Sequence, residues 1–455
     1  MVSFKSNAKN YRDAESMAAA YLAAYFANSK IKYPLNPFKM LKDEGVEFKI
    51  CNFNKLEGVY IPAQSQEDIS IVGISAKRPI TRQRFTAAHE LCHHFRDADK
   101  QVACPIGKKN ASEYFADAFA SALLMPMGEL KIKVNEYKDI NGNVSFDDIL
   151  KIADYFGVSF EACVRRIAYK IHAVEGDIEN KELKKRIRRY HPDKKRKEYG
   201  MSYENLYSDL IDNYAEQLKF APNDYAKNVF ENTYIYNDSR MEGLNVSIEE
   251  ASEIVTDLRN NLQNSQYCSE ENEAYLSVAG HYLMYQDIFE VPVRSSLNVY
   301  DSFKLNRDLF AYYPHPEFGG NPRQNNVVIS GAKFEAVDYH DIFNELAKVD
   351  LEIKSFFNDK DGIRPSDHIK HVVRIHHRIT VIHPFPEGNG RTARAFMNVQ
   401  LVRAGLTPIY IKVEEKQRYV EALEKADIEK NYDDLYECIF RVMLRSHVEL
   451  SKEPI

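Results

Sequence analysis

Residues 383–394 read HPFPEGNGRTAR, and this stretch places the parts of a phosphate site in one short loop and the helix expected after it. A glycine stands on each side of its asparagine, which allows backbone N–H groups at the start of that helix to turn toward an anion. His383 can act as a base, and Glu387 can hold Mg²⁺ against phosphate oxygens. Arg391 and Arg394 are three residues apart and therefore share a helical face. The stretch predicts a site that handles phosphate groups.

The same stretch resembles the signature of the Fic family, H-P-F-x-[D/E]-G-N-G-R-x-x-R, at every fixed position. The resemblance covers about residues 215–450 and implies transfer of AMP from ATP to a Ser, Thr or Tyr hydroxyl of a protein target. It implies that His383 deprotonates the hydroxyl, that Glu387 holds Mg²⁺, and that Arg394 meets the γ-phosphate. The other contacts to the nucleotide phosphates are then assigned to Gly388, Asn389, Gly390 and Arg391.

Two further segments resemble parts of the Fic fold. YNDSRMEGLNVSIEEA, residues 236–251, resembles the inhibitory helix written [ST]-x-x-x-E-[GN]. Its Glu242 is expected to pair with Arg394 where the γ-phosphate should bind, so that ATP sits wrongly for in-line attack. The first position is Asp238 instead of Ser or Thr; Asp also caps helices, and the alternative is a weaker clasp. NNVVISGAKFEAV, residues 325–337, is expected to form a β-hairpin flap that docks the target by adding a strand.

A second motif, TAAHELCHHF, predicts a metal site in the first half of the chain. On a helix, His89 and His93 lie on one face and can hold one ion, with Glu90 placed to take a proton from metal-bound water. A catalytic zinc also needs a third protein ligand and an open position. The stretch SEYFADAFASALLMP offers Glu113 as that ligand, and the alternative is that Glu113 merely begins a helix, where acidic residues are favoured.

TRQRFTAAHELCHHF followed by SEYFADAFASALLMP resembles the ImmA/IrrE family of metallopeptidases over roughly residues 15–170. The resemblance implies that both histidines and Glu113 bind zinc and that Glu90 is the general base. Members of the family typically cleave helix-turn-helix repressors, which suggests a repressor, or this chain itself, as the substrate. One departure is Cys92, where glycine is frequent; it is either a buried small residue or a thiol that restrains the zinc-bound water or senses oxidation.

The chain is too long, at 455 residues, for one domain of about 100–200 residues, so several domains are expected. We expect an N-terminal α+β zincin-like metallopeptidase domain over residues 1–175 and a basic helical linker over 176–214. A mainly α-helical Fic domain with a β-hairpin flap is expected over 215–455. Within the first domain, the patterns predict strands at 45–50, 58–62 and 69–75 and helices at 81–97 and 111–125.

Composition and charge indicate which cellular compartment and which classes of partner to expect. The net charge of −6 indicates no general affinity for nucleic acid or membranes, and the six cysteines form no C-x-x-C pair, which favours a reducing compartment. Residues 17–29 are expected to form an amphipathic first helix and not a signal peptide, so a cytoplasmic protein is expected. Residues 152–167 have helix-turn-helix spacing, but acidic side chains on them oppose phosphate contact, so a structural helix pair is favoured. The sequence indicates no oligomeric state.

These patterns together predict a bifunctional protein that uses Zn²⁺, Mg²⁺ and ATP. Its Fic half is an AMP transferase that Glu242 inhibits, and its first half is a zinc-dependent endopeptidase. The alternative is a Fic half that removes AMP or transfers another nucleotide or phosphoryl group, under a first half that only senses a signal or binds a partner. The pairing would suit a toxin-like module.

Overall fold

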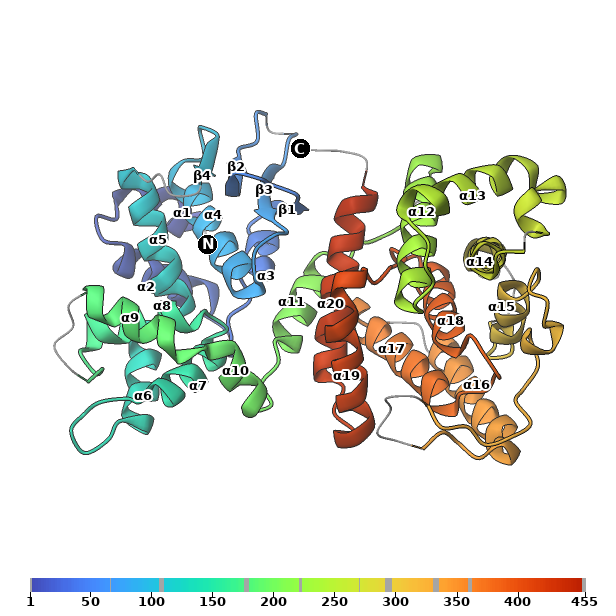
Figure 1. Ribbon diagram of the computed structural model, residues 1–455. Helices are drawn as coiled ribbons and strands as arrows, with labels where there is room; N and C mark the ends of the chain where they lie inside the picture. The colour runs from blue at the N-terminus through green and yellow to red at the C-terminus, as the bar shows by residue number, and fades with distance from the viewer. Residues whose placement is uncertain are drawn as a thin grey trace. The chain divides into compact units, whose positions relative to one another are not determined.

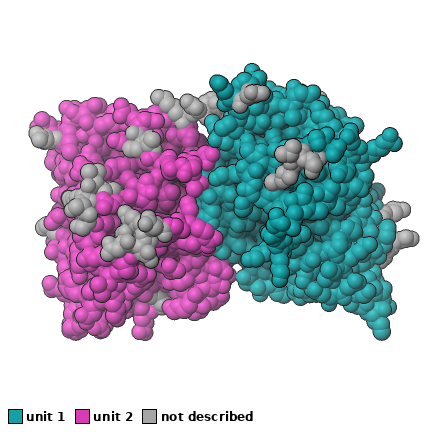
Figure 2. Space-filling view, turned by 180° about the vertical axis from the view of Figure 1, so that it is seen from behind, with its two compact units in different colours: residues 1–214, 454–455 teal, residues 215–453 magenta. Residues whose placement is uncertain are grey.

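The computed structural model describes residues 2–65, 67–105, 110–175, 180–220, 223–269, 271–290, 297–329, 335–358 and 362–451. The chain divides after Tyr214 into two compact units, which Figure 2 colours teal and magenta. Unit 1 combines helices with one small sheet, and the described part of unit 2 is mainly helical and has no named strand, so the expected two-domain architecture is confirmed. Among the described helices, none is both long enough and apolar enough to cross a bilayer.

The sheet of unit 1 has the strand order β1-β3-β2-β4. β1 runs parallel to β3, whereas β2 is antiparallel to both of its neighbours. The three predicted strands are present with small shifts of their ends, and the short β4 was not predicted. Their bounds are β1 (Val46–Cys51), β2 (Leu56–Ile61), β3 (Ser70–Ser75) and β4 (Val102–Pro105).

Figure 1 shows this sheet together with the helices of unit 1. The long helix expected at 81–97 is α4 (Ile80–Arg96), which packs against β2, β3 and the next long helix, α5 (Ala111–Leu124). α5 begins where the Asn110 side chain accepts a hydrogen bond from the backbone N–H of Glu113 at 3.0 Å, and it ends just before Pro126. The remaining helices are α1 (Val2–Asn7), α2 (Ala14–Tyr25), α3 (Pro37–Asp43), α6 (Met127–Tyr137), α7 (Phe146–Phe156), α8 (Phe160–Arg166), α9 (Asn180–Tyr190), α10 (Pro192–Glu198) and α11 (Glu204–Asn213).

The segment expected to be a linker is mostly helical where it is described, and its helices α9, α10 and α11 are part of unit 1. Tyr190 of α9 stacks on Phe160 of α8 with ring centroids 4.5 Å apart. Arg196 of α10 is buried and pairs with Asp154 of α7 at 2.7 Å. α7 and α8, which carry the helix-turn-helix spacing, therefore hold side chains of α9 and α10.

Unit 2 is built around α14, which packs against α12, α13, α15 and α18. Its buried core joins apolar side chains from all of these helices, including Phe230, Ile254, Leu305 and Phe396. α17 and α18 pack closely along each other, and the loop between them holds the HPFPEG stretch. The helices are α12 (Asp224–Met241), α13 (Ile248–Asn261), α14 (Glu273–Glu290), α15 (Asp301–Leu309), α16 (Ile342–Asn358), α17 (Pro365–Ile382), α18 (Asn389–Arg403), α19 (Lys416–Glu429) and α20 (Asp433–Leu450).

The expected β-hairpin flap at 325–337 falls partly outside the described residues, since 330–334 are not among them. The described parts on either side contain no strand. The Asn326 side chain joins these two parts, because it donates to Asp338 Oδ2 at 2.8 Å and accepts from the Tyr339 N–H at 2.9 Å. The two ends of the segment are thereby held together.

Candidate active sites

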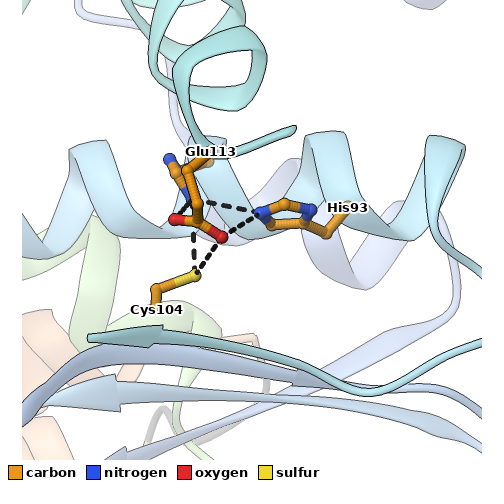
Figure 3. Close-up of side chains that lie close together, drawn as sticks. His93, Cys104 and Glu113 are labelled. Atoms are coloured by element: carbon orange, nitrogen blue, oxygen red, sulfur yellow. Dashed lines mark hydrogen bonds and ion pairs between the residues drawn. The ribbon is translucent and has the colours of Figure 1, made fainter. Parts of the chain in front are cut away.

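The predicted zinc ligands of unit 1 meet at one point. His89 and His93, one turn apart on α4, bring their Nε2 atoms to 3.1 Å from each other. Glu113, in the first turn of α5, places Oε2 3.4 Å from His89 Nε2 and Oε1 3.4 Å from His93 Nε2. Figure 3 shows His93 and Glu113 converging above the sheet, together with Cys104 of β4. The three predicted ligands are thus supplied by two packed helices.

The separations between these atoms fit a tetrahedral zinc ion. Ligands at the usual zinc distances of about 2.0–2.3 Å lie about 3.3–3.8 Å apart along the edges of a tetrahedron. The two nitrogen–oxygen distances of 3.4 Å, one to each Glu113 oxygen, fall in this range, and the Nε2–Nε2 distance of 3.1 Å is slightly shorter. Nitrogen and carboxylate oxygen are common zinc ligands, so the chemistry of this set fits zinc as well as its geometry does.

Each histidine ring is oriented by a second carboxylate. His89 Nδ1 lies 3.0 Å from Asp117 Oδ1, and His93 Nδ1 lies 2.7 Å from Asp97 Oδ2. A proton held on Nδ1 by a carboxylate leaves the Nε2 lone pair directed at the metal position. Burial alone would lower the pKa of His89, but hydrogen bonds to Asp117 and Glu113 raise it to about 9. Asp97 and Asp117 were not predicted, although each lies four residues after a predicted ligand.

Glu90, the expected general base, is fully buried beside the metal position. Neither of its carboxylate oxygens has a hydrogen-bond partner of normal geometry among the described residues. Burial raises the pKa of Glu90 above its usual range, and the neighbouring histidines and the Cys104 thiol oppose part of this rise. A buried carboxylate without a partner is costly, and a water held between Glu90 and a metal ion would satisfy it. The β2 residue Gly58 makes room for this carboxylate, because a Cβ there would lie 2.3 Å from Glu90 Oε1.

A thiol approaches the metal position, but it is not the one considered from the sequence. Cys92 is buried on α4 and lies outside the group of possible ligand atoms found in the described part of the chain. That group contains Cys104 of β4, whose Sγ is 3.4 Å from His89 Nε2. Sequence spacing gives no sign of Cys104, because its position depends on the pairing of β4 with β2. The six cysteines, all of them described, form no disulfide.

The expected base of unit 2, His383, ends α17 in a left-handed conformation, with φ of 51°. This backbone turn directs the chain into the loop that precedes α18. His383 Nδ1 lies 3.3 Å from the Thr380 carbonyl oxygen, which fixes a proton on Nδ1 and leaves Nε2 able to accept one. Burial lowers the pKa of His383 below its usual value. Arg323 donates to the His383 carbonyl oxygen at 2.7 Å and so ties this point to the segment before the expected flap.

The loop after His383 is closed by the side chain of Asn389. Its Nδ2 donates to the Phe385 carbonyl oxygen at 2.7 Å, and its Oδ1 accepts from the Phe385 N–H at 2.9 Å. The Asn389 side chain therefore shapes the loop, which leaves backbone N–H groups as the cradle. Gly388 caps α18 with φ of 75°, and no side chain there accepts the first N–H groups of the helix. Glu387 is exposed at the mouth of this loop.

The two arginines of the signature lie buried on α18, and one is held by an ion pair predicted from the sequence. Arg391 Nη1 donates to Ser277 Oγ at 2.9 Å, and its Nε has no partner among the described residues. Arg394 Nη2 donates to Glu242 Oε1 at 2.5 Å. A Cβ on Gly390 would lie 3.1 Å from that same oxygen, so the pair sits directly against the start of α18. The structure thus brings together the Arg394–Glu242 pair that the sequence predicts.

Asp238 forms a second ion pair with the same arginine. Its Oδ1 accepts a hydrogen bond from Arg394 Nε, and its Oδ2 lies 2.9 Å from His281 Nε2. Burial opposes ionisation of Asp238, but the Arg394 charge and the His281 hydrogen bond hold its pKa below the usual value. The side chain of Asp238 is only 4% exposed, against 32% for that of Glu242. The aspartate that departs from the family pattern therefore holds Arg394 from the buried side.

Comparison with known proteins gives a match for each unit. A family model for the IrrE N-terminal-like domain matches residues 41–168, and one for the Fic/DOC family matches residues 296–401. "Protein adenylyltransferase Fic" of Nematostella vectensis is 30% identical over 132 residues, which are 29% of this chain and 29% of that protein. "Protein adenylyltransferase fic-1" of Caenorhabditis elegans is 32% identical over 77 residues, 17% of this chain and 15% of that protein. The chain thus spans less than a third of the length of either relative.

Two solved structures are similar to parts of the chain. Fic-1 (aa134–508) from C. elegans has 16% sequence identity and a TM-score of 0.45, with 72% of this chain and 87% of that chain covered. A Fic-domain-containing signaling protein from Bacteroides thetaiotaomicron has 20% identity and a TM-score of 0.43, with 53% and 94% covered.

Proposed function

We propose that this chain, in which an IrrE N-terminal-like domain is followed by a Fic/DOC domain, transfers AMP from ATP to a protein hydroxyl and that Glu242 restrains this activity. The observation that carries the proposal is the position of Arg394. Its guanidinium lies at the start of α18, where a triphosphate would bind, and it is already bound to Glu242 at 2.5 Å. The adenylyltransferases among the relatives support the choice of AMP as the transferred group.

The residues of the loop and of α18 have separate roles in the proposed reaction. His383 Nε2 takes the proton of the Ser, Thr or Tyr hydroxyl as that oxygen attacks the α-phosphorus of ATP. The new oxygen–phosphorus bond forms as the bond to the pyrophosphate oxygen breaks. The N–H groups at the start of α18 and the buried Arg391 stabilise the charge on the phosphate oxygens. Glu387, exposed at the loop, would hold Mg²⁺, which neutralises charge on the leaving pyrophosphate.

Inhibition follows from the competition of two anions for one arginine. While Glu242 occupies Arg394 Nη2, the γ-phosphate lacks that contact and the nucleotide cannot take the in-line position. Asp238 remains on Nε in either state, because the ion pair is buried and is shared with His281. Glu242 is the last-turn residue that caps α12, and its side chain is partly exposed, so it can leave Arg394 without unfolding the helix.

We also propose that unit 1 is a zinc-dependent endopeptidase whose substrate is a repressor or this chain itself. His89, His93 and Glu113 would hold the ion, which supplies Lewis acidity and lowers the pKa of a bound water. Glu90 would take the proton of that water. The proposal is supported by the full burial of the Glu90 carboxylate beside the three ligands, where neither oxygen has a hydrogen-bond partner of normal geometry among the described residues.

Labelled ATP tests the transferase. The full chain carrying Glu242→Gly is incubated with Mg²⁺ and ATP labelled either at the α-phosphate or at the γ-phosphate. We expect protein-bound label from the α-position only, and none when His383→Ala is added to Glu242→Gly. Label from the γ-position would mean phosphorylation instead, and loss of AMP from a pre-modified protein without any gain would mean the reverse reaction. Glu249→Gly, which removes another exposed glutamate of unit 2, serves as the matched control.

A further inference from the structure

The zinc position of unit 1 is approached by one more ligand atom than a peptidase needs. Cys104 Sγ lies 3.4 Å from His89 Nε2 and 3.7 Å from Glu113 Oε1. Together with His93 these residues place one ligand atom each within 4.8 Å of all the others. The thiol separations agree with the edges of about 3.3–3.8 Å expected for a zinc tetrahedron. The side chain is also shielded, because Cys104 is only 6% exposed.

We propose that Cys104 is the fourth zinc ligand and that it keeps the peptidase site closed until its thiolate leaves the metal. This inference rests on the zinc site proposed above for unit 1. Four-coordinate zinc with only protein ligands is typical of structural sites, whereas catalytic sites keep one position for water or substrate. With Cys104 bound, the ion has no such position, and Glu90 has no water to deprotonate.

The thiol lies where the catalytic water would be held. Cys104 is the register partner of Gly58 in the antiparallel pair of β4 and β2, so their side-chain directions face the same side of the sheet. A Cβ built on Gly58 would point at Glu90, because it would lie 2.3 Å from Glu90 Oε1. Cys104 therefore faces the carboxylate that would hold the water. Figure 3 shows its sulfur below Glu113, on the sheet side of the ligand group.

Closing and opening the site involve no electron transfer. On closing, the Cys104 thiol would lose its proton to solvent, and the thiolate would take the position that a water holds in an open site. On opening, the thiolate would take up a proton and a water would regain that position. β4 is the last strand in the order of the described sheet and pairs with β2 alone, so a shift of this strand would draw the thiolate away from the metal position. Anything that moves β4 would thus activate the peptidase.

Binding of Co²⁺ tests the ligand directly. We would add Co²⁺ to the metal-free full chain, measure bound cobalt per chain, and record the near-ultraviolet band that thiolate coordination produces. We expect the wild-type chain to bind cobalt with this band, and Cys104→Ser to bind cobalt without it. Cys92→Ser, a change at a buried cysteine outside the ligand group, should keep the band. Loss of a ligand should also weaken zinc binding at least about tenfold, since losing even an outer partner costs about 10–100-fold.

The outcomes separate this inference from the zinc site on which it rests. Cobalt bound by the wild-type chain without the band would overturn Cys104 as a ligand while leaving the three-ligand site intact. No cobalt bound would overturn both. The spectrum of the wild-type chain gives this answer even if Cys104→Ser does not fold.

Discussion

Glu242→Gly should raise the rate of AMP transfer by about five- to tenfold. The substitution removes the hydrogen bond and ion pair of 2.5 Å between Glu242 Oε1 and Arg394 Nη2. A hydrogen bond to a charged group contributes about 1.5–3 kcal/mol. The Glu242 side chain is 32% exposed, so solvent screening reduces the effective value to about 1–1.4 kcal/mol. Since about 1.4 kcal/mol shifts an equilibrium tenfold, the fraction of chains able to accept the γ-phosphate rises by that factor.

The initial rate of AMP incorporation, measured over a range of ATP concentrations, tests this value. Glycine is common at the C-terminal ends of helices, so Glu242→Gly should leave the fold of α12 intact. Glu242→Gln should give an intermediate rate, because it keeps the shape of the side chain and loses its charge. A rate for Glu242→Gly within twofold of that for Glu249→Gly would refute the clasp, provided both variants fold like the wild-type chain.

Three other predictions concern the surroundings of the two sites. Asp238→Ser should lower the free energy of unfolding by about 3–5 kcal/mol, because it removes the buried carboxylate that accepts from Arg394 Nε and contacts His281 Nε2. Thermal unfolding should show a much smaller loss for Glu242→Gly, and equal losses would contradict the assigned burial. Gly58→Ala should abolish peptidase activity yet keep zinc binding, because the atoms nearest to its Cβ would include those of Glu90 but none of the proposed metal ligands. A fully active variant with one bound zinc would refute this geometry. Burial lowers the pKa of His383, so Nε2 becomes protonated and stops acting as a base only when the pH falls below the usual histidine value of about 6.5. The transfer rate should therefore be level between about pH 7 and 8, and a half-maximal rate above about pH 7 would contradict this.

Local sequence patterns were sufficient where function depends on one helix or one loop. The spacing of His89 and His93 gave the metal face of α4, and the glycine-rich loop marked the start of α18. The pair between Glu242 and Arg394, which lies across two helices, was predicted only because the surrounding sequence resembles a known inhibitory helix. The strands and long helices of unit 1 followed from periodicity, with shifts of a few residues at their ends.

Contacts between distant segments could not be predicted in this way. Cys104 reaches the zinc ligands because β4 pairs with β2, and a strand of four residues gives almost no periodic signal. His281 meets Asp238 across a separation of 43 residues, through the packing of α14 on α12. The basic composition of residues 176–214 indicated a linker, but Tyr190 and Arg196 of that segment pack against α7 and α8. Tertiary packing outweighs composition there.

The most direct test of the central claim is intact-mass spectrometry of the wild-type and Glu242→Gly chains after incubation with Mg²⁺ and ATP, with and without added zinc. We predict an added mass equal to one AMP group that accumulates faster in Glu242→Gly and is absent when His383→Ala is also present. A zinc-dependent truncation that disappears in Glu90→Gln would identify the chain as its own peptidase substrate. The account would be contradicted if Glu242→Gly gained no AMP, on itself or on any protein of a cell extract, while still binding ATP.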